Sequence, residues 1–118
     1  MNRKNIGDIG ENRAVEFLKK KGYKILSRNY RCRFGEIDII AKDRNCFVFV
    51  EVKTRRDTSY GRPVEAISRV KISRIVKTLN FYLAQNRIYD SDIRIDAIEV
   101  FMKTLSEVDI NHIENIVC

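Results

Sequence analysis

Two apolar segments joined by a short polar connection constrain the fold of this chain more than any other feature. Residues 35–41 and 46–53 are rich in Ile, Val and Phe, which favours β-strands. The polar residues 42–45 lie between them and suit a hairpin. A two-residue loop at residues 44–45, or a four-residue loop at residues 43–46, gives one and the same antiparallel register. The segments therefore predict a β-hairpin with that register.

The predicted register brings polar side chains to one face of the hairpin. Asp38 lies opposite Glu51, and Glu36 lies opposite Lys53. Directly opposed residues of an antiparallel pair point to the same face, so the four side chains converge. A loop of three or five residues would break this arrangement, because a slip of one residue inverts every side chain. The apolar side chains are expected on the other face, namely those of Ile37, Ile39, Val48, Val50 and Val52.

The converging polar side chains indicate a chemistry. Facing carboxylates are unfavourable unless one pKa rises or a cation neutralises them. Carboxylate oxygens suit hard ions such as Mg²⁺, which usually keeps water and completes its shell with substrate phosphate. A neighbouring lysine can orient an attacking water, so Asp38, Glu51 and Lys53 indicate metal-assisted hydrolysis of a phosphodiester. The alternative is a solvated strand end at which Glu36 and Lys53 form an ordinary ion pair.

Length and composition indicate a single globular unit. The 118 residues suit one compact domain, and we expect one domain over residues 1–118. Hydrophobic residues make up 44% of the chain, and no run approaches the roughly 18 apolar residues of a transmembrane helix. The first residues lack the apolar core of a signal peptide. Three widely spaced cysteines and one histidine argue for reduced thiols, a cytoplasmic location and no zinc site.

The charge balance points to an anionic partner. The formal charge is +7, from 23 Lys and Arg against 16 Asp and Glu. For a small domain, such a balance suggests a polyanion such as nucleic acid. A basic ring that holds phosphates around an acidic pocket that holds an ion would suit metal-dependent cutting of such a polymer. Basic residues follow the acidic hairpin end in this order: Arg55, Arg56, Arg62, Arg69, Lys71, Arg74 and Lys77.

Apolar periodicity predicts the other elements. In a helix over residues 6–21, Glu11 falls at the edge of the apolar face and points towards the body of the domain. The alternative for Glu11 is an ordinary first-turn glutamate favoured by the helix dipole. Lys71 lies beside the apolar stripe of a later helix, so it either snorkels over the core or reaches into the site. We expect a strand over 23–33, a helix over 64–86, a strand over 93–102, and a strand or an irregular tail over 107–117.

Two further polar residues favour structural roles. Asp96 lies inside a strand whose apolar neighbours predict burial, where pairing with an arginine is expected rather than catalysis. His112 has no serine or cysteine motif with which to form a nucleophilic triad. The sequence also contains neither a phosphate-binding P-loop nor a GxGxxG motif.

Three motifs together resemble the YraN-type family of small bacterial proteins. They are Gly7-x-x-Gly10-Glu11-x-x-Ala14, Gly35-Glu36-Ile37-Asp38-Ile39-Ile40-Ala41 and Val48-Phe49-Val50-Glu51-Val52-Lys53-Thr54-Arg55. The match continues through Tyr60-Gly61-x-Pro63 and the Lys71 helix to Arg94-x-Asp96, and so covers nearly the whole chain. That family resembles the PD-(D/E)xK nuclease superfamily, especially the archaeal Holliday-junction resolvases.

The resemblance implies an α/β, restriction-endonuclease-like fold with a mixed central β-sheet flanked by helices. The implied metal carboxylates are Glu11, Asp38 and Glu51, and the implied catalytic lysine is Lys53. Ile37 stands where the superfamily name has proline, a position that carries no chemistry. The implied activity is that of an endonuclease that uses Mg²⁺ or Mn²⁺ and acts on DNA, including branched or damaged DNA.

Each expected site residue has a role under this interpretation. Asp38 and Glu51 ligate the metal, with the Val52 carbonyl as a further ligand, and Glu11 binds it directly or through water. Lys53 positions the attacking water. Nucleic acid is bound by Arg55, Arg56, Arg62 and Lys71. Two other interpretations stay open: a nucleic-acid-binding module that does not cut, and a protein-interaction domain whose basic face binds an acidic protein. A second copy of the chain, forming a homodimer, is a further candidate partner.

Overall fold

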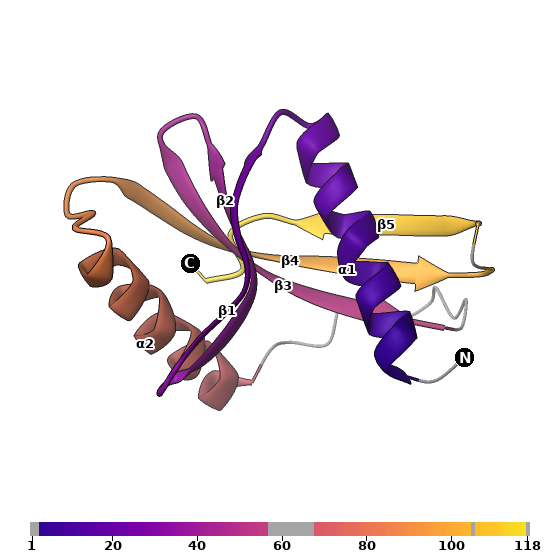
Figure 1. Cartoon of the computed structure of the whole chain (residues 1–118), viewed down its shortest axis with the longest axis horizontal. Coiled ribbons are helices and arrows are strands. Elements are labelled where there is room, and N and C mark those ends of the chain that lie inside the picture. The colour runs from indigo at the N-terminus through magenta and orange to yellow at the C-terminus, as the bar shows by residue number, and fades with distance from the viewer. Residues whose placement is uncertain (1–2, 57–67, 105, 118) are drawn as a thin grey trace.

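Five strands in chain order form one mixed sheet in the described part of the chain (Figure 1). The computed structural model describes residues 3–56, 68–104 and 106–117. Its elements are α1 (Arg3–Lys20), β1 (Lys24–Cys32), β2 (Gly35–Asp43), β3 (Cys46–Arg55), α2 (Arg69–Gln85), β4 (Asp92–Met102) and β5 (Val108–Ile113).

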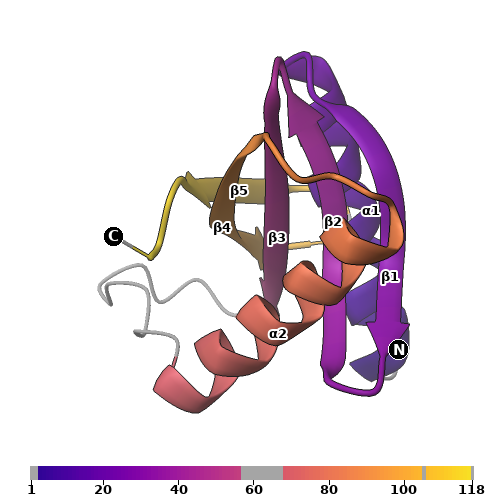
Figure 2. The ribbon, with the colours of Figure 1, turned by 90° about the vertical axis from the view of Figure 1, so that its left-hand side faces the viewer.

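The sheet combines antiparallel and parallel pairing. Strands β1, β2 and β3 form an antiparallel meander, β3 and β4 are parallel, and β4 and β5 are antiparallel. Parallel neighbours need a long crossover, and α2 belongs to the one between β3 and β4. Helix α1 covers one face of the sheet and α2 the other (Figures 1 and 2). The expected mixed central sheet flanked by helices is therefore confirmed, and it is consistent with a restriction-endonuclease-like fold.

Each helix covers its own apolar core. Leu18 and Ala14 of α1 pack with Ile39, Ala41, Val48 and Val50 of the central strands. Ile75 and Leu79 of α2 pack with Ile37, Ile40, Phe47 and Phe49. Burial of these fully enclosed side chains supplies most of the driving force for folding, at roughly 1.5–3 kcal/mol for each large apolar group.

One apolar residue lies in a different core from the expected one. Ile37 was predicted to share a face with Ile39, but it packs in the α2 core. The prediction assumed that β2 and β3 stay paired along their whole length. Their pairing instead stops at Ile39, and there the alternation of side chains is interrupted: Asp38 lines the pocket beside α1 and Ile39 packs in the α1 core, so Ile37 points towards α2.

The start of α2 also differs from the sequence prediction. A helix was expected from residue 64, but α2 begins at Arg69, directly after the N-cap residue Ser68. The Ser68 hydroxyl accepts a hydrogen bond from the Lys71 N–H at 3.2 Å, which satisfies one of the free donors of the first turn. Residues 64–67 lie outside the described part of the chain. The cap fixes the position of Lys71 in the first turn of α2.

The C-terminal segment combines the two alternatives considered for it. The ambiguous segment 107–117 contains a strand, β5, followed by residues without regular structure. The thiols of Cys32 and Cys46 are free. None of the helices in the described ranges is long and apolar enough to cross a membrane.

Candidate functional site

A fork between β2 and β3 forms the centre of the candidate site. The two strands pair from Asp43–Cys46 at the loop to Ile39–Val50, which confirms the predicted register. Beyond that pair the strands part, because β2 stays paired only with β1 and β3 only with β4. We call the opening the fork.

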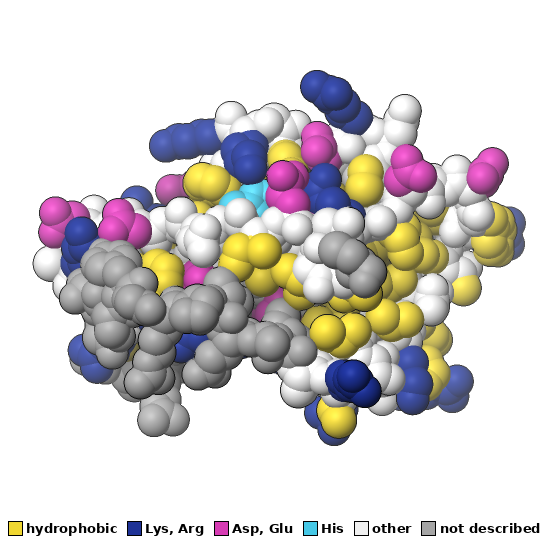
Figure 3. All heavy atoms as spheres, turned by 180° about the vertical axis from the view of Figure 1, so that it is seen from behind, with side chains coloured by type: hydrophobic (Ala, Val, Ile, Leu, Met, Phe, Trp, Pro, Cys, Tyr) yellow, Lys and Arg dark blue, Asp and Glu magenta, His cyan; other side chains and the backbone are white. Residues whose placement is uncertain are grey.

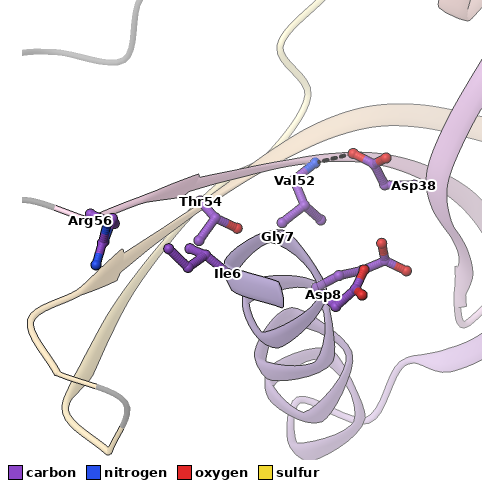
Figure 4. A pocket seen from close by; sticks show the side chains of 8 residues that line it. Ile6, Gly7, Asp8, Asp38, Val52, Thr54 and Arg56 are labelled. Carbon is purple, nitrogen blue, oxygen red and sulfur yellow. Dashed lines mark hydrogen bonds between the residues drawn. The ribbon is translucent and has the colours of Figure 1, made fainter. Parts of the chain in front are cut away.

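Asp38 is the first residue of β2 inside the fork. Its carboxylate accepts a hydrogen bond from the Val52 N–H at 2.8 Å, shown as a dashed line in Figure 4. A side chain thus takes the donor that a continuing ladder would have used. The expected Asp38–Glu51 and Glu36–Lys53 pairs consequently do not form rungs of the sheet. The hydrogen bond holds the Asp38 carboxylate against the backbone of β3.

An open pocket of about 570 Å³ lies between the fork and the first turns of α1. Figure 4 shows Asp38 and Arg56 towards opposite ends of this pocket, with Asp8 on the adjoining helix. The lining residues are Ile6, Gly7, Asp8, Glu11, Asp38, Val52, Thr54 and Arg56. The pocket therefore brings together two predicted metal carboxylates and one predicted nucleic-acid-binding residue.

Gly10 sets the distance between α1 and the fork. A Cβ built on Gly10 would lie 1.9 Å from Thr54 Oγ1 and 2.7 Å from Thr54 Cγ2. Only a residue without a side chain permits this approach of the helix to β3. The contact places Glu11, the next residue, at the pocket with 9% of its surface exposed. It explains physically why a glycine precedes that glutamate.

The surroundings of the Asp38 carboxylate disfavour its ionised form. Burial, followed by repulsion from Glu51, raises the pKa of Asp38 from 3.8 to about 7. Glu11 and Glu36 raise this pKa further, and the hydrogen bond from the Val52 N–H lowers it. The carboxylates around the fork thus repel one another as the sequence predicts.

Glu51 lies on β3 beside the fork and is paired with a lysine. Lys71 Nζ contacts Glu51 Oε1, and 11% of the Glu51 side chain is exposed. Of the two alternatives for Lys71, snorkelling over the core is not what the structure shows, because the ammonium group contacts the Glu51 carboxylate. The ammonium group supplies part of the positive charge that the carboxylates require.

Glu11 is held from the other side of the fork by β1. Its Oε1 accepts hydrogen bonds from Arg28 Nε at 3.2 Å and from Asn29 Nδ2 at 3.1 Å. Asn29 has a φ of +53°, a left-handed conformation that asparagine tolerates better than most residues. The predicted orientation of Glu11 towards the body of the domain is confirmed, since its side chain is buried while Glu16 is exposed.

The alternative ion pair across the hairpin is absent from the described residues. Glu36 pairs with Arg31 at 2.9 Å, and both side chains are largely exposed. Lys53 is half-buried and forms no ion pair with any described residue. The described residues therefore leave the charge of Lys53 without an ion-pair partner.

The three carboxylates expected to hold a metal do not form a ligand group in the described part of the chain. Within the described ranges, no three Asp, Glu, His or Cys side chains form a group that could hold a metal ion as they stand. Lys71 and Arg28 occupy two of the expected carboxylates, Glu51 and Glu11. The oxygen donors and the raised pKa of Asp38 nevertheless fit a hard divalent cation.

The expected nucleic-acid-binding residues differ in availability. Arg56 is exposed at the pocket, whereas Arg55 Nε lies 3.4 Å from the buried carboxylate of Glu99. Lys71 already contacts Glu51. Arg62 lies outside the described residues.

Sequence reasoning did not include Asp8 or Thr54 in the site. Asp8 is exposed, lines the pocket and precedes Glu11 by one helical turn. Its spacing from Glu11 could have indicated the shared side, because residues three apart are neighbours on a helix. No such local signal identifies Thr54, whose place depends on how α1 packs on β3.

Asp96 belongs to a separate, structural network. It is fully buried and receives hydrogen bonds from Arg94 at 2.8 and 2.9 Å and from the Asn115 N–H at 2.9 Å. His112 Nε2 lies 2.7 Å from Asp96 Oδ2. Burial opposes the charge, but the bonds from His112 and Arg94 lower the pKa of Asp96 below its usual value. The predicted structural pair with an arginine is confirmed.

Similar proteins identify the family. Residues 10–100 match the family model of UPF0102, described as an uncharacterised protein family. A UPF0102 protein of Caldicellulosiruptor saccharolyticus is 47% identical over 116 residues, which cover 98% of each chain. A UPF0102 protein of Trichlorobacter lovleyi is 46% identical over 93% of this chain and 87% of its own length. One from Clostridium botulinum is 50% identical over 87% of this chain and 85% of its own. The chain therefore belongs to the UPF0102 family, which confirms the YraN-type resemblance of its motifs.

Proposed function

We propose that this protein is an endonuclease that uses Mg²⁺ or Mn²⁺ to hydrolyse phosphodiester bonds in DNA. The observation that carries the proposal is the fork, where burial and Glu51 raise the pKa of Asp38 to about 7 beside an open pocket. A divalent cation would remove this repulsion, and phosphate would complete its coordination shell. The net charge of +7 suits a polyanionic substrate.

The three proposed metal carboxylates come from three elements that meet at the fork, β2, β3 and α1. Asp38 and Glu51 would hold the ion from β2 and β3, with the Val52 carbonyl as a further ligand. Glu11 would bind it directly or through water from α1. When bound, a divalent ion lowers the pKa of an attacking water and offsets charge on the phosphate. Lys71 and Arg28 would exchange their carboxylate contacts for contacts with the substrate or solvent.

Lys53 would position the attacking water. Lys53 is half-buried and forms no ion pair with a described residue, so none of the described carboxylates holds it in an ion pair. A compact ammonium can donate to water and to a phosphate oxygen at the same time, since it carries three donors. Such a positioned group contributes roughly 100-fold or more to a rate.

DNA would lie across the pocket and the adjacent basic residues. Arg56 is exposed at one end of the pocket and can contact phosphate directly. Lys71 borders the carboxylates and would contact phosphate when the metal replaces it at Glu51. Arg55 contributes less, because Glu99 neutralises it. These contacts recognise the DNA backbone and leave the preferred DNA structure to the shape of the surface.

A panel of linear, nicked, flapped and four-way DNAs tests the proposal. We expect cleavage of at least one substrate with Mg²⁺ or Mn²⁺, none with EDTA, and loss of cleavage in Asp38→Asn. Glu16→Gln is the matched control, because Glu16 is exposed on the far side of α1. Absence of metal-dependent cleavage on the entire panel would defeat the proposal.

A non-catalytic nucleic-acid-binding module is the second candidate. It is favoured by the contacts of Lys71 with Glu51 and of Arg28 with Glu11, which neutralise two carboxylates without a metal. Under this alternative, DNA binds in a salt-dependent manner and divalent ions neither cleave it nor stabilise the protein. A protein-interaction domain would instead bind no DNA at low salt.

A further inference from the structure

The turn between β1 and β2 is docked on α2 by a close backbone approach. A Cβ on Gly35 would lie 3.3 Å from Thr78 Oγ1 and 3.7 Å from Arg74 Cβ. The preceding residue, Phe34, packs edge-on against Phe81 of α2, with ring centroids 6.1 Å apart. The guanidinium of Arg33 lies 4.8 Å from the centroid of the Phe34 ring. The turn and the helix thus hold an aromatic pair beside a cation.

A line of cations joins this aromatic pair to the fork. Lys71, Arg74, Lys77 and Phe81 follow one another at intervals of three or four residues, so they lie along one side of α2. Lys71 contacts Glu51 at one end, and Phe81 contacts Phe34 at the other. A rise of 1.5 Å per residue makes the line about 15 Å long. Figure 3 shows the molecule from behind, so α2, at the lower left of Figure 1, falls at the lower right. Lys, Arg and hydrophobic side chains mix there.

Beyond Lys71, which contacts Glu51, the cations beside the aromatic pair are exposed and have no ion-pair partner among the described residues. Arg33, Arg74 and Lys77 are exposed, and none of them forms an ion pair with a residue of the described ranges. Phe81 is 37% exposed. Unpaired cations at short intervals repel one another and attract a polyanion. An exposed phenyl ring offers nothing to a phosphate, but its face suits a nucleobase.

We propose that this line binds an unpaired segment of DNA, with a base stacked on the Phe34–Phe81 pair and the phosphates along α2. The partner is single-stranded because the bases of a duplex are stacked on each other and cannot reach an aromatic ring. The line of about 15 Å leaves room for the phosphates of a few nucleotides between the stacked base and the fork. The inference rests on the proposed function, which places cleavage at the fork. The substrate is then DNA with an unpaired strand beside the bond that is cut.

Binding in EDTA tests the site without cleavage. Fluorescence anisotropy at low salt compares a labelled single-stranded 12-mer with the same sequence as a duplex. Phe81→Ala and Phe34→Ala should each weaken single-strand binding roughly tenfold, the usual size of one base–aromatic stack, and change duplex binding less than twofold. Tyr89→Ala is the matched control, because Tyr89 is an aromatic residue 80% exposed outside the line.

The salt dependence of binding tests the role of the cations. Replacing Arg74 and Lys77 together by glutamine should reduce the slope of log Kd against log salt for the single strand by roughly 1.4, or about 0.7 for each phosphate contact. Phe81→Leu keeps apolar packing against Phe34 but removes the ring face. It should therefore weaken single-strand binding like Phe81→Ala while the melting temperature stays near wild type.

The outcomes separate this inference from the proposed function. Equal losses for single strand and duplex, unchanged binding in both Phe81 variants, or no wild-type DNA binding at low salt would each overturn the unpaired-strand site. Retained single-strand preference without cleavage under Mg²⁺ or Mn²⁺ would defeat the endonuclease proposal and leave the binding site standing.

Discussion

Asp38→Asn should stabilise the metal-free protein, and the gain should grow with pH. The pKa of Asp38 is raised from 3.8 to about 7, so the folded protein binds this proton more tightly than the unfolded chain. Stability from the protonated group is complete below about pH 4 and is lost as pH rises through 7. Asparagine carries no charge and can still accept the bond from the Val52 N–H, so the variant avoids this loss.

The shift sets the size of the effect. A change from 3.8 to about 7 corresponds to at most about 4 kcal/mol. Partial exposure of Asp38 and rearrangement of Lys71 towards the fork reduce this to about 1–2 kcal/mol. For a chain of 118 residues, we expect a rise in Tm of about 4–8 °C at pH 8.

Thermal unfolding of both proteins in EDTA between pH 4.5 and 8 measures the difference. The Tm gap between Asp38→Asn and wild type should be smallest at pH 4.5 and reach its full size near pH 8. Added Mg²⁺ or Mn²⁺ should raise the Tm of the wild type and close the gap, because ligand binding stabilises the folded state. Glu16→Gln should show no comparable pH dependence. A variant that is less stable than wild type at pH 8, or a gap independent of pH, would refute the reasoning.

Three further changes probe the surroundings of the fork. Lys71→Met should tighten Mn²⁺ binding several-fold by calorimetry, because the lysine competes with the metal for the Glu51 carboxylate. The same change should weaken DNA binding. Unchanged affinity for both ligands would contradict the place of Lys71 in the site. Gly10→Ala should cost about 1–3 kcal/mol in chemical denaturation through overlap with Thr54, and Thr54→Gly should recover part of it; a neutral Gly10→Ala would show that α1 packs differently. Arg56→Gln should lower the salt slope of duplex binding by about 0.9, whereas Arg55→Gln should mainly reduce stability; a larger slope change for Arg55→Gln would reverse these roles.

The hairpin and its register could be predicted because local signals determine them. Alternating β-branched residues define the two strands, and both loops considered for the polar connection, at residues 44–45 or 43–46, give the observed register. Asp38 and Glu51 lie directly beyond the last pair of that register and do not pair with each other, yet the pKa of Asp38 responds to Glu51. The helical spacing of the apolar residues likewise predicted that Glu11 points towards the body of the domain.

Other features depend on contacts that periodicity does not encode. The fork arises because β2 and β3 follow different neighbours beyond Ile39–Val50, and this moves Ile37 into the α2 core. The ion pair between Arg55 and Glu99 joins β3 and β4, which are far apart in sequence. It partly neutralises Arg55 next to the site. The close contact of Gly10 with Thr54 sets the pocket, yet each residue looks ordinary in its own segment.

Single-turnover cleavage of the best DNA of the panel, with Mn²⁺, tests the central claim most directly. Wild type and Glu16→Gln should cut at the same rate, and Asp38→Asn should not cut measurably. Lys53→Ala should bind metal and DNA normally but cut roughly 100-fold more slowly or worse, and Lys53→Arg should not restore the rate, since a wide planar guanidinium cannot replace a compact ammonium. Asp38→Asn and Lys53→Ala both cutting within a few-fold of wild type would contradict a nuclease site at the fork.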